Sequence, residues 1–128
     1  MIVVDTHAWF WWVTESTRLS QAARTRLRQD RDVVVPDVCL WEIAMMANRG
    51  RLSPAVNAAR FLDEAIAWDD VRVQPITPGV AIRGELLGRT LALDPSDSLI
   101  AATALELRAP LATADERLRQ VPGLEIVW

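Results

Sequence analysis

The chain has 128 residues, of which 51% are hydrophobic and 24% charged, and its formal net charge is −3. These values are typical of one soluble globular domain with a substantial core, and the acidic balance gives no sign of a nucleic-acid binder. One cysteine and one histidine exclude an internal disulfide and a zinc cluster.

We expect residues 1–128 to form a single domain in the cytoplasm. The lone Cys39 fits a reducing compartment, and the N-terminus lacks the features of an export signal. No apolar run approaches the roughly 20 residues that a membrane helix needs, so we expect no membrane partner. All 14 basic residues are arginine, which excludes any mechanism that needs a catalytic lysine.

Apolar runs alternate with helix-like segments along the chain, which predicts βαβ units and a parallel sheet. The expected strands are residues 2–4, 33–35, 71–75, 111–113 and 124–127, the third of them at a sheet edge. The expected helices are residues 8–13, 21–31, 38–48, 54–68, 78–90, 95–108 and 116–120. The residues expected to cap helices at their N-termini are Ser20, Asp37, Ser53, Thr77, Asp94 and Asp115.

A carboxylate follows the first strand directly. Ile2, Val3 and Val4 form a short apolar run that suits a strand buried on both faces, and Asp5 comes next. In open α/β sheets, ligands bind in the crevice beyond the carboxyl ends of the strands. Asp5 is therefore either a ligand-binding acid or only the N-cap of the following helix, and this segment alone does not decide between the two.

The helix expected over residues 38–48 is apolar on all sides except at Glu42, so we expect it to be buried on most sides. An ionised glutamate in such a place is costly unless it is paired or binds a metal. A structural ion pair with an arginine is one interpretation. Because no arginine lies within one turn of Glu42 on this helix, we favour a metal or catalytic role.

Two further carboxylates stand at the ends of predicted elements. Asp97 lies at the third position of its helix, where a carboxylate also favours the helix dipole, and a mostly apolar helix behind it packs inward. Asp115 follows a short apolar strand, although it can also be only a helix cap.

Asp5, Glu42, Asp97 and Asp115 come from four separate elements and are predicted to converge at one crevice. Like charges that close together repel and raise one another's pKa, and a divalent cation is the simple way to keep them ionised. Ligands that are all oxygen select hard cations, so we expect Mg²⁺ or Mn²⁺. Such ions activate water and hold a phosphodiester for in-line attack.

The chain resembles the PIN-domain ribonucleases, and among them the VapC-type toxins of bacterial toxin–antitoxin pairs. The resemblance rests on four pieces in the right order and spacing: V-V-D-T-H-A-W-F-W-W at 3–12, L-W-E-I-A-M at 40–45 with G-R-L at 50–52, L-D-P-S-D-S-L-I-A-A-T-A at 93–104, and L-A-T-A-D at 111–115. It implies a three-layer α/β/α fold with a five-stranded parallel sheet, and an Mg²⁺- or Mn²⁺-dependent endoribonuclease held silent by an antitoxin.

The resemblance also implies roles for particular residues. Asp5, Glu42 and Asp97 match the metal-binding acidic triad, and Asp115 matches a fourth carboxylate. Thr113 matches the hydroxyl residue often found beside it, and we expect Thr6 and Thr113 to contact the RNA substrate.

The resemblance implies a cognate antitoxin as partner. A C-terminal segment of that antitoxin is expected in a groove walled by Trp9–Trp12 and Trp41, with one basic residue reaching the carboxylates. Self-association through another face would give a homodimer and a hetero-oligomer with the antitoxin.

Some positions depart from the family pattern. Ser98 stands where an arginine often follows the third acid, which removes an expected anchor for phosphate or for neighbouring carboxylates. Cys39 and Met46 stand where serine and lysine are frequent. None of these changes removes a predicted metal ligand.

Three other functions compete with this interpretation. A phosphoacceptor receiver domain would need a lysine, which the chain lacks. A haloacid-dehalogenase-type phosphatase would need an aspartate two residues after Asp5, where the chain has His7. A metal-free binding or scaffold module on the same fold stays open, and metal titration separates it from the enzyme.

Overall fold

The computed structural model describes residues 1–52 and 57–128. It contains a five-stranded parallel sheet with strand order β3-β2-β1-β4-β5. The strands are β1 (Ile2–Val4), β2 (Val33–Pro36), β3 (Val71–Gln74), β4 (Leu111–Ala112) and β5 (Ile126–Val127). The predicted parallel sheet is confirmed, with β3 at an edge, and the last two strands are shorter than expected.

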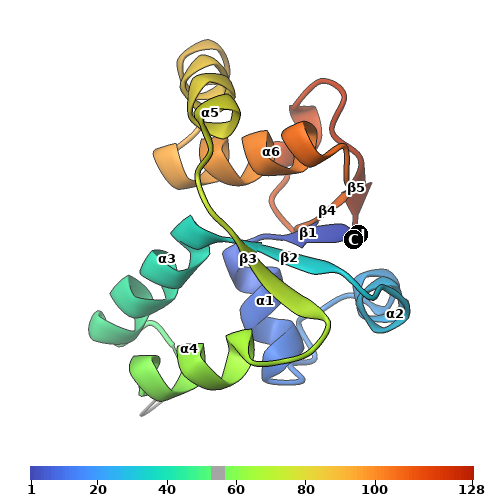
Figure 1. Ribbon diagram of the computed structural model, residues 1–128, viewed down its shortest axis with the longest axis vertical. Coiled ribbons are helices and arrows are strands. Elements are labelled where there is room, and N and C mark those ends of the chain that lie inside the picture. Colours follow the sequence, from blue (N-terminus) through green and yellow to red (C-terminus); the bar gives the residue numbers. More distant parts are fainter. Residues whose placement is uncertain (53–56) are drawn as a thin grey trace.

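Helices cover both sides of the sheet, as the predicted three-layer arrangement requires. Figure 1 shows α5 and α6 on one side and α1 to α4 on the other. The helices are α1 (Thr6–Val13), α2 (Gln21–Gln29), α3 (Asp37–Asn48), α4 (Ala58–Ile66), α5 (Pro78–Leu91) and α6 (Pro95–Leu107), with a short 3-10 turn η1 (Leu118–Gln120) before β5. No helix in the described ranges is long and apolar enough to cross a membrane.

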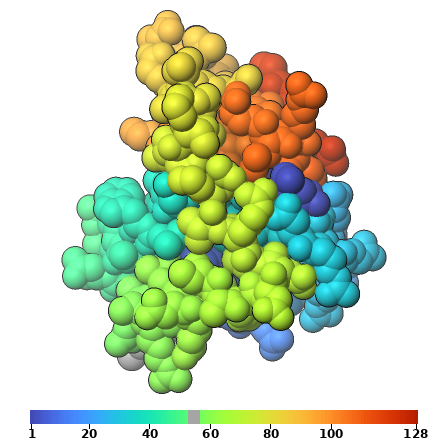
Figure 2. All heavy atoms as spheres, in the orientation of Figure 1, coloured from blue at the N-terminus to red at the C-terminus, as the bar shows by residue number. Residues whose placement is uncertain are grey.

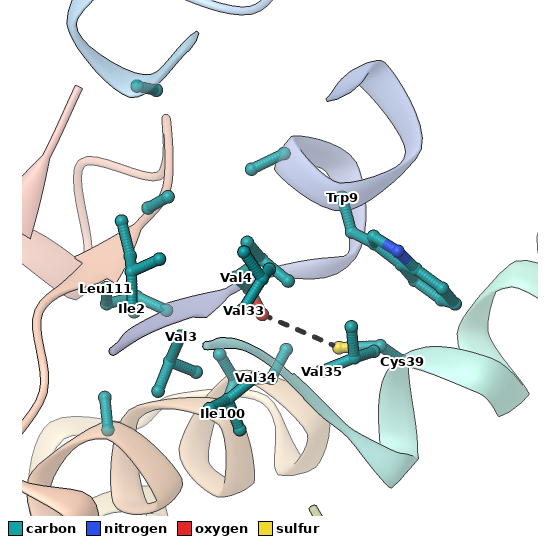
Figure 3. Packing of buried hydrophobic residues seen from close by; sticks show 14 of the residues in the cluster. Ile2, Val3, Val4, Trp9, Val33, Val34, Val35, Cys39, Ile100 and Leu111 are labelled. Carbon is teal, nitrogen blue, oxygen red and sulfur yellow. Dashed lines mark hydrogen bonds between the residues drawn. The ribbon is translucent and has the colours of Figure 1, made fainter. Parts of the chain in front are cut away.

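The two central strands are buried on both faces because helices pack on each side of them. Figure 3 shows Val3 and Val34 directed toward Ile100 of α6, whereas Val4 and Val33 point toward α1. Val3 pairs in register with Val34, and Ile2 pairs with Val33. The helices on each face of the sheet therefore pack against branched apolar side chains from both strands. Because both faces of β1 and β2 are covered, every position along these strands is buried and carries an apolar residue.

The chain order of the sheet creates a switch point between β1 and β4. From β1 the chain adds β2 and then β3 on one side, and it returns to add β4 and β5 on the other. The crossovers after neighbouring strands therefore leave in opposite directions, and a crevice opens beyond the carboxyl ends of β1 and β4. Asp5 and the segment after Ala112 lie at this place.

Edge strand β3 lies at the surface. In Figure 2 the segment from β3 to α5 crosses the front of the molecule, with α4 below it and α5 above. Only Val71 of this strand is buried, and the other three residues are partly exposed. This agrees with the alternation that marked the segment as an edge strand.

Three of the predicted caps differ in the structure. Ser20 and Thr77 accept the expected cap hydrogen bonds, but α3 begins at Asp37 itself, and the Asp37 carboxylate accepts from the Ile76 N–H at 3.0 Å. Asp94 is at the N-cap position without a side-chain cap bond, because its carboxylate faces Arg117 instead. Asp115 does not cap η1, whose preceding residue is Arg117.

The predicted cap Ser53 lies outside the described residues. In the structure α4 begins at Ala58 after Asn57, whose side chain accepts from the Arg60 N–H.

The expectation that α3 is buried on most sides is wrong. Trp41 is 60% exposed and Ala44 is also exposed, whereas Cys39, Ile43 and Met46 are buried. The residues of α3 are almost all apolar, so composition alone does not reveal which face of the helix has no neighbour. Trp41 is consequently on the surface.

Candidate functional site

A pocket of about 460 Å³ opens at the switch point, and all four predicted acids line it. Asp5 follows β1, Glu42 lies on α3, Asp97 lies in the first turn of α6, and Asp115 follows β4. The pocket therefore collects carboxylates from four parts of the chain, in agreement with the expected convergence of these elements. Their roles in catalysis and metal binding stay predictions.

Asp5 is both a helix cap and a pocket acid. One carboxylate oxygen accepts from the Ala8 N–H at 2.7 Å, and the other accepts from the Thr113 hydroxyl. Asp5 is 8% exposed, and burial raises the pKa of its carboxyl group despite these hydrogen bonds. The two readings of Asp5 are thus compatible, because capping uses one oxygen and fixes the direction of the other.

Glu42 is held by hydroxyl groups. Thr6 donates to one carboxylate oxygen at 2.6 Å and Ser96 donates to the other at 3.1 Å. No arginine forms an ion pair with Glu42 among the described residues, so the alternative of a structural ion pair has no support there. The hydroxyls fix the direction of the carboxylate and leave its charge uncompensated.

Asp97 and Asp115 respond differently to the pocket. Burial and the nearby charge of Asp115 raise the pKa of Asp97 to about 6, although Arg117 opposes this rise. Hydrogen bonds from Arg117 lower the pKa of Asp115. Asp97 is therefore the acid of this pair whose ionisation the metal-free protein disfavours.

Arg117 is a pocket residue that the sequence did not identify. Its guanidinium lies 2.8 Å from Asp97, 2.9 Å from Asp115 and 3.4 Å from Asp94. The only sequence signal was its position two residues after Asp115. That spacing does not predict a contact with α6, which is twenty residues earlier in the chain.

The ligand chemistry fits a hard divalent cation. The four predicted acids and Asp94 line one pocket, and among the described lining residues His7 alone offers a nitrogen ligand. Within residues 1–52 and 57–128, however, no group of three or more such side chains is arranged as around a bound ion. Arg117 instead lies against two of the acids.

The two threonines predicted to contact substrate donate hydrogen bonds to pocket carboxylates. Thr6 is 3% exposed and donates to Glu42, and Thr113 is fully buried and donates to Asp5. The Thr113 oxygen also accepts from the Asp115 N–H at 3.0 Å, which links the residues after β1 and β4. The structure supports a positioning role for both hydroxyls, and substrate contact stays a prediction.

Ser98 does not face the pocket. It is 2% exposed, its hydroxyl donates to the Asp94 carbonyl at 2.9 Å, and a Cβ placed on Gly88 would lie 3.0 Å from it. Ser98 is therefore packed at the close approach of α5 to α6. The guanidinium that the family pattern led us to expect near the acids is supplied here by Arg117.

A longer groove of about 1020 Å³ continues from the pocket. Both spaces share His7, Trp11, Arg18 and Glu42. One side of the groove is formed by α1 and the segment that follows it, and the other side is formed by the C-terminal half of α3. Apart from the shared residues, it is lined by Phe10, Thr14, Ser16, Thr17, Met45, Met46, Arg51 and Leu52.

The predicted tryptophan wall of this groove is partly wrong. Trp11 lines both spaces and packs against His7 with ring centres 5.5 Å apart. Trp9 is fully buried in the core and does not line the groove. Trp41 is exposed on another face of α3.

Known proteins match this chain along its whole length. A model of the PIN domain matches residues 2–124. The chain is 34% identical to ribonuclease VapC22 of Mycobacterium tuberculosis over 129 residues. This alignment covers 99% of this chain and 98% of that protein.

Solved structures of other proteins share the fold. VapC20 of Mycobacterium tuberculosis, a sarcin-ricin loop cleaving toxin, has a TM-score of 0.74 at 17% identity over 100% of both chains. A chain of a toxin-antitoxin complex from Klebsiella pneumoniae has a TM-score of 0.69 at 17% identity, covering 97% of this chain and 95% of that one. The match over residues 2–124, together with the identity to VapC22, shows that this chain belongs to the PIN domain family.

Proposed function

We propose that this PIN domain is a ribonuclease toxin that hydrolyses RNA phosphodiester bonds with a divalent cation, Mg²⁺ or Mn²⁺. The observation that carries the proposal is the single pocket at the β1–β4 switch point, which Asp5, Glu42, Asp97 and Asp115 all line. The relative at 34% identity is named as a ribonuclease, which supports RNA as the substrate.

The four carboxylates would hold the cation, and hydroxyl groups of the chain prepare two of them. Thr113 and the Ala8 N–H orient Asp5, while Thr6 and Ser96 orient Glu42. When bound, the cation would activate a water molecule and stabilise charge on the phosphodiester. The chain's own residues keep the oxygen ligands directed into the pocket and limit the number of conformations they must lose on binding.

Cleavage of a single-stranded or hairpin RNA tests this function. The purified protein should cut the RNA with Mg²⁺ or Mn²⁺ and stop in excess EDTA. Glu42→Gln should lower the rate by at least about 100-fold, because it removes a predicted charged ligand. Glu116→Gln, an exposed change beside the pocket, is the matched control and should keep the rate.

Undiminished cleavage in EDTA would contradict the metal-dependent mechanism. A protein that binds neither Mn²⁺ nor Mg²⁺ and cuts no RNA would favour the metal-free binding module instead.

The same proposal includes an antitoxin partner. One structural relative is a toxin-antitoxin complex, and the groove beside the pocket offers apolar side chains such as Phe10 and Met45 next to the acids of the pocket. A peptide with an apolar side and one basic residue would fit both features. We also propose a homodimer and a hetero-oligomer with the antitoxin, which light scattering of the purified complex would measure.

A further inference from the structure

Arg117 makes contacts unlike those of the other arginines in the described ranges. Seven other arginines form ion pairs there, each with a single carboxylate. Arg117 is within 4 Å of three carboxylates, from Asp94, Asp97 and Asp115. Two of these are predicted metal ligands, so this guanidinium lies inside the candidate metal site.

The turn after β4 places Arg117 there. The Asp115 N–H donates to the Thr113 hydroxyl at 3.0 Å, and the Arg117 N–H donates to the Asp115 carboxylate at 2.8 Å. These two bonds fold the chain back on itself within five residues. The Arg117 side chain is thereby directed toward the first turn of α6, where it meets Asp97.

The contacts use oxygen atoms that a cation would need. The Nη2 group of Arg117 donates to Oδ2 of Asp97 at 2.8 Å and to Oδ2 of Asp115 at 2.9 Å. A guanidinium nitrogen and a metal ion cannot occupy the same position between these oxygens. The Arg117 side chain is 54% exposed, so it can move into solvent without opening the core.

We propose that Arg117 is a built-in counter-ion of the metal site: it neutralises Asp97 and Asp115 in the metal-free protein and is displaced when the divalent cation binds. The inference rests on the proposed function, because it takes these acids to be metal ligands. Arg117 then acts as a positioning residue. It keeps the two carboxylates together before metal arrives, and it lowers the apparent metal affinity because the cation must replace it.

Manganese titration of the metal-free protein by calorimetry tests the proposal. Arg117→Gln should bind Mn²⁺ roughly three- to tenfold more tightly than the unchanged protein, because a partly exposed positive charge no longer competes for the same oxygens. Arg117→Lys should fall between the two, because an ammonium group keeps the charge but cannot bridge two carboxylates in a fork. Arg119→Gln is the matched control, since Glu116 is the one ion-pair partner of Arg119 among the described residues, and its Mn²⁺ affinity should stay within about twofold.

Thermal unfolding gives a second measurement on the same variants. In EDTA, Arg117→Gln should melt at a lower temperature than the unchanged protein, because Asp97 and Asp115 then repel each other without a counter-ion. Saturating Mn²⁺ should raise its melting temperature more than it raises that of the unchanged protein. Circular dichroism confirms that each variant is folded.

The outcomes separate this inference from the proposed function. If the unchanged protein binds Mn²⁺ and Arg117→Gln binds it equally or less tightly, the counter-ion role is wrong and the metal site remains. If no variant binds Mn²⁺, the metal site and the counter-ion role fail together. Binding of Mn²⁺ by Arg117→Gln alone would support the proposal in its strongest form.

Discussion

At Asp97, as at Asp5, the fold opposes ionisation of a pocket carboxyl group. Burial and the charge of Asp115 raise the pKa of Asp97 from 3.8 to about 6. A carboxyl group whose pKa is raised on folding contributes stability at pH values below its pKa in the unfolded chain. That stability is lost as the pH rises through the folded pKa of about 6. In EDTA, we therefore expect the free energy of unfolding at pH 7 to be lower than it would be with an uncharged group at this position.

The variant Asp97→Asn should accordingly stabilise the metal-free protein at pH 7 by roughly 1–2 kcal/mol, after allowance for solvent screening. Near pH 4 the difference should shrink, because Asp97 is then protonated in the folded protein. Urea unfolding at both pH values in EDTA measures it. A variant that is less stable than the unchanged protein at pH 7 would show that the ion pair with Arg117 outweighs burial.

Substitutions of single acids should separate ligands from caps. Asp5→Asn, Glu42→Gln and Asp97→Asn are each expected to abolish RNA cleavage while the protein stays folded. Asp115→Asn should be milder if this acid only supports a second ion. Asp94→Asn should be nearly silent, because asparagine suits the N-cap position, Asp94 makes no side-chain cap bond that could be lost, and its contact with Arg117 is long, at 3.4 Å. Loss of activity in Asp94→Asn but not in Asp97→Asn would place the functional acid one turn away from our assignment.

At the scale of elements, the ends of β1 and β4 are joined by one buried hydroxyl. Thr113 donates to Asp5 and accepts from the Asp115 N–H. Thr113→Val keeps the shape and leaves both partners without this bond, which should lower the free energy of unfolding by about 1–3 kcal/mol. It should also weaken Mn²⁺ binding, because Asp5 and Asp115 lose a common orienting group.

Thr103→Val on α6 is the matched control for this change. Thr103 is also buried, but its one hydrogen-bond partner in the described part of the chain is the Leu99 carbonyl of the same helix, at 2.8 Å. Its loss should cost less than about 1 kcal/mol and leave metal affinity unchanged. Equal effects of the two substitutions on stability and on Mn²⁺ binding would mean that Thr113 only fills space.

The buried strands and Asp5 could be predicted from the sequence, whereas the contacts of Arg117 and the exposure of Trp41 could not. The branched residues of β1 and β2 predict strands that are buried on both faces. The position of Asp5 in the pocket could be predicted because Asp5 directly follows the first of these strands. The role of Arg117 depends on a turn that brings it across to α6, and no periodic pattern encodes that contact. The exposed side of α3 was missed for a related reason: Trp41 is apolar, and only tertiary structure shows that no element of the described chain covers it.

At the scale of the whole molecule, the groove and the acidic pocket form one continuous surface that a partner can cover at once. His7, Trp11, Arg18 and Glu42 belong to both spaces. A bound antitoxin segment would bury apolar side chains along the groove and bring a basic residue to the acids, where it would compete with Arg117 for the same oxygens. Inhibition and loss of metal should therefore occur together.

Two substitutions on α3 test where that segment binds. Met45 lines the groove, whereas its neighbour Ala44 is exposed and does not line it. Met45→Glu should weaken the complex with the antitoxin by tenfold or more, because a charge would enter an apolar contact. Ala44→Glu adds the same charge one residue away and should keep the affinity within about threefold. Calorimetric titration of the two variants measures the difference, and equal affinities would place the antitoxin on another face of the molecule.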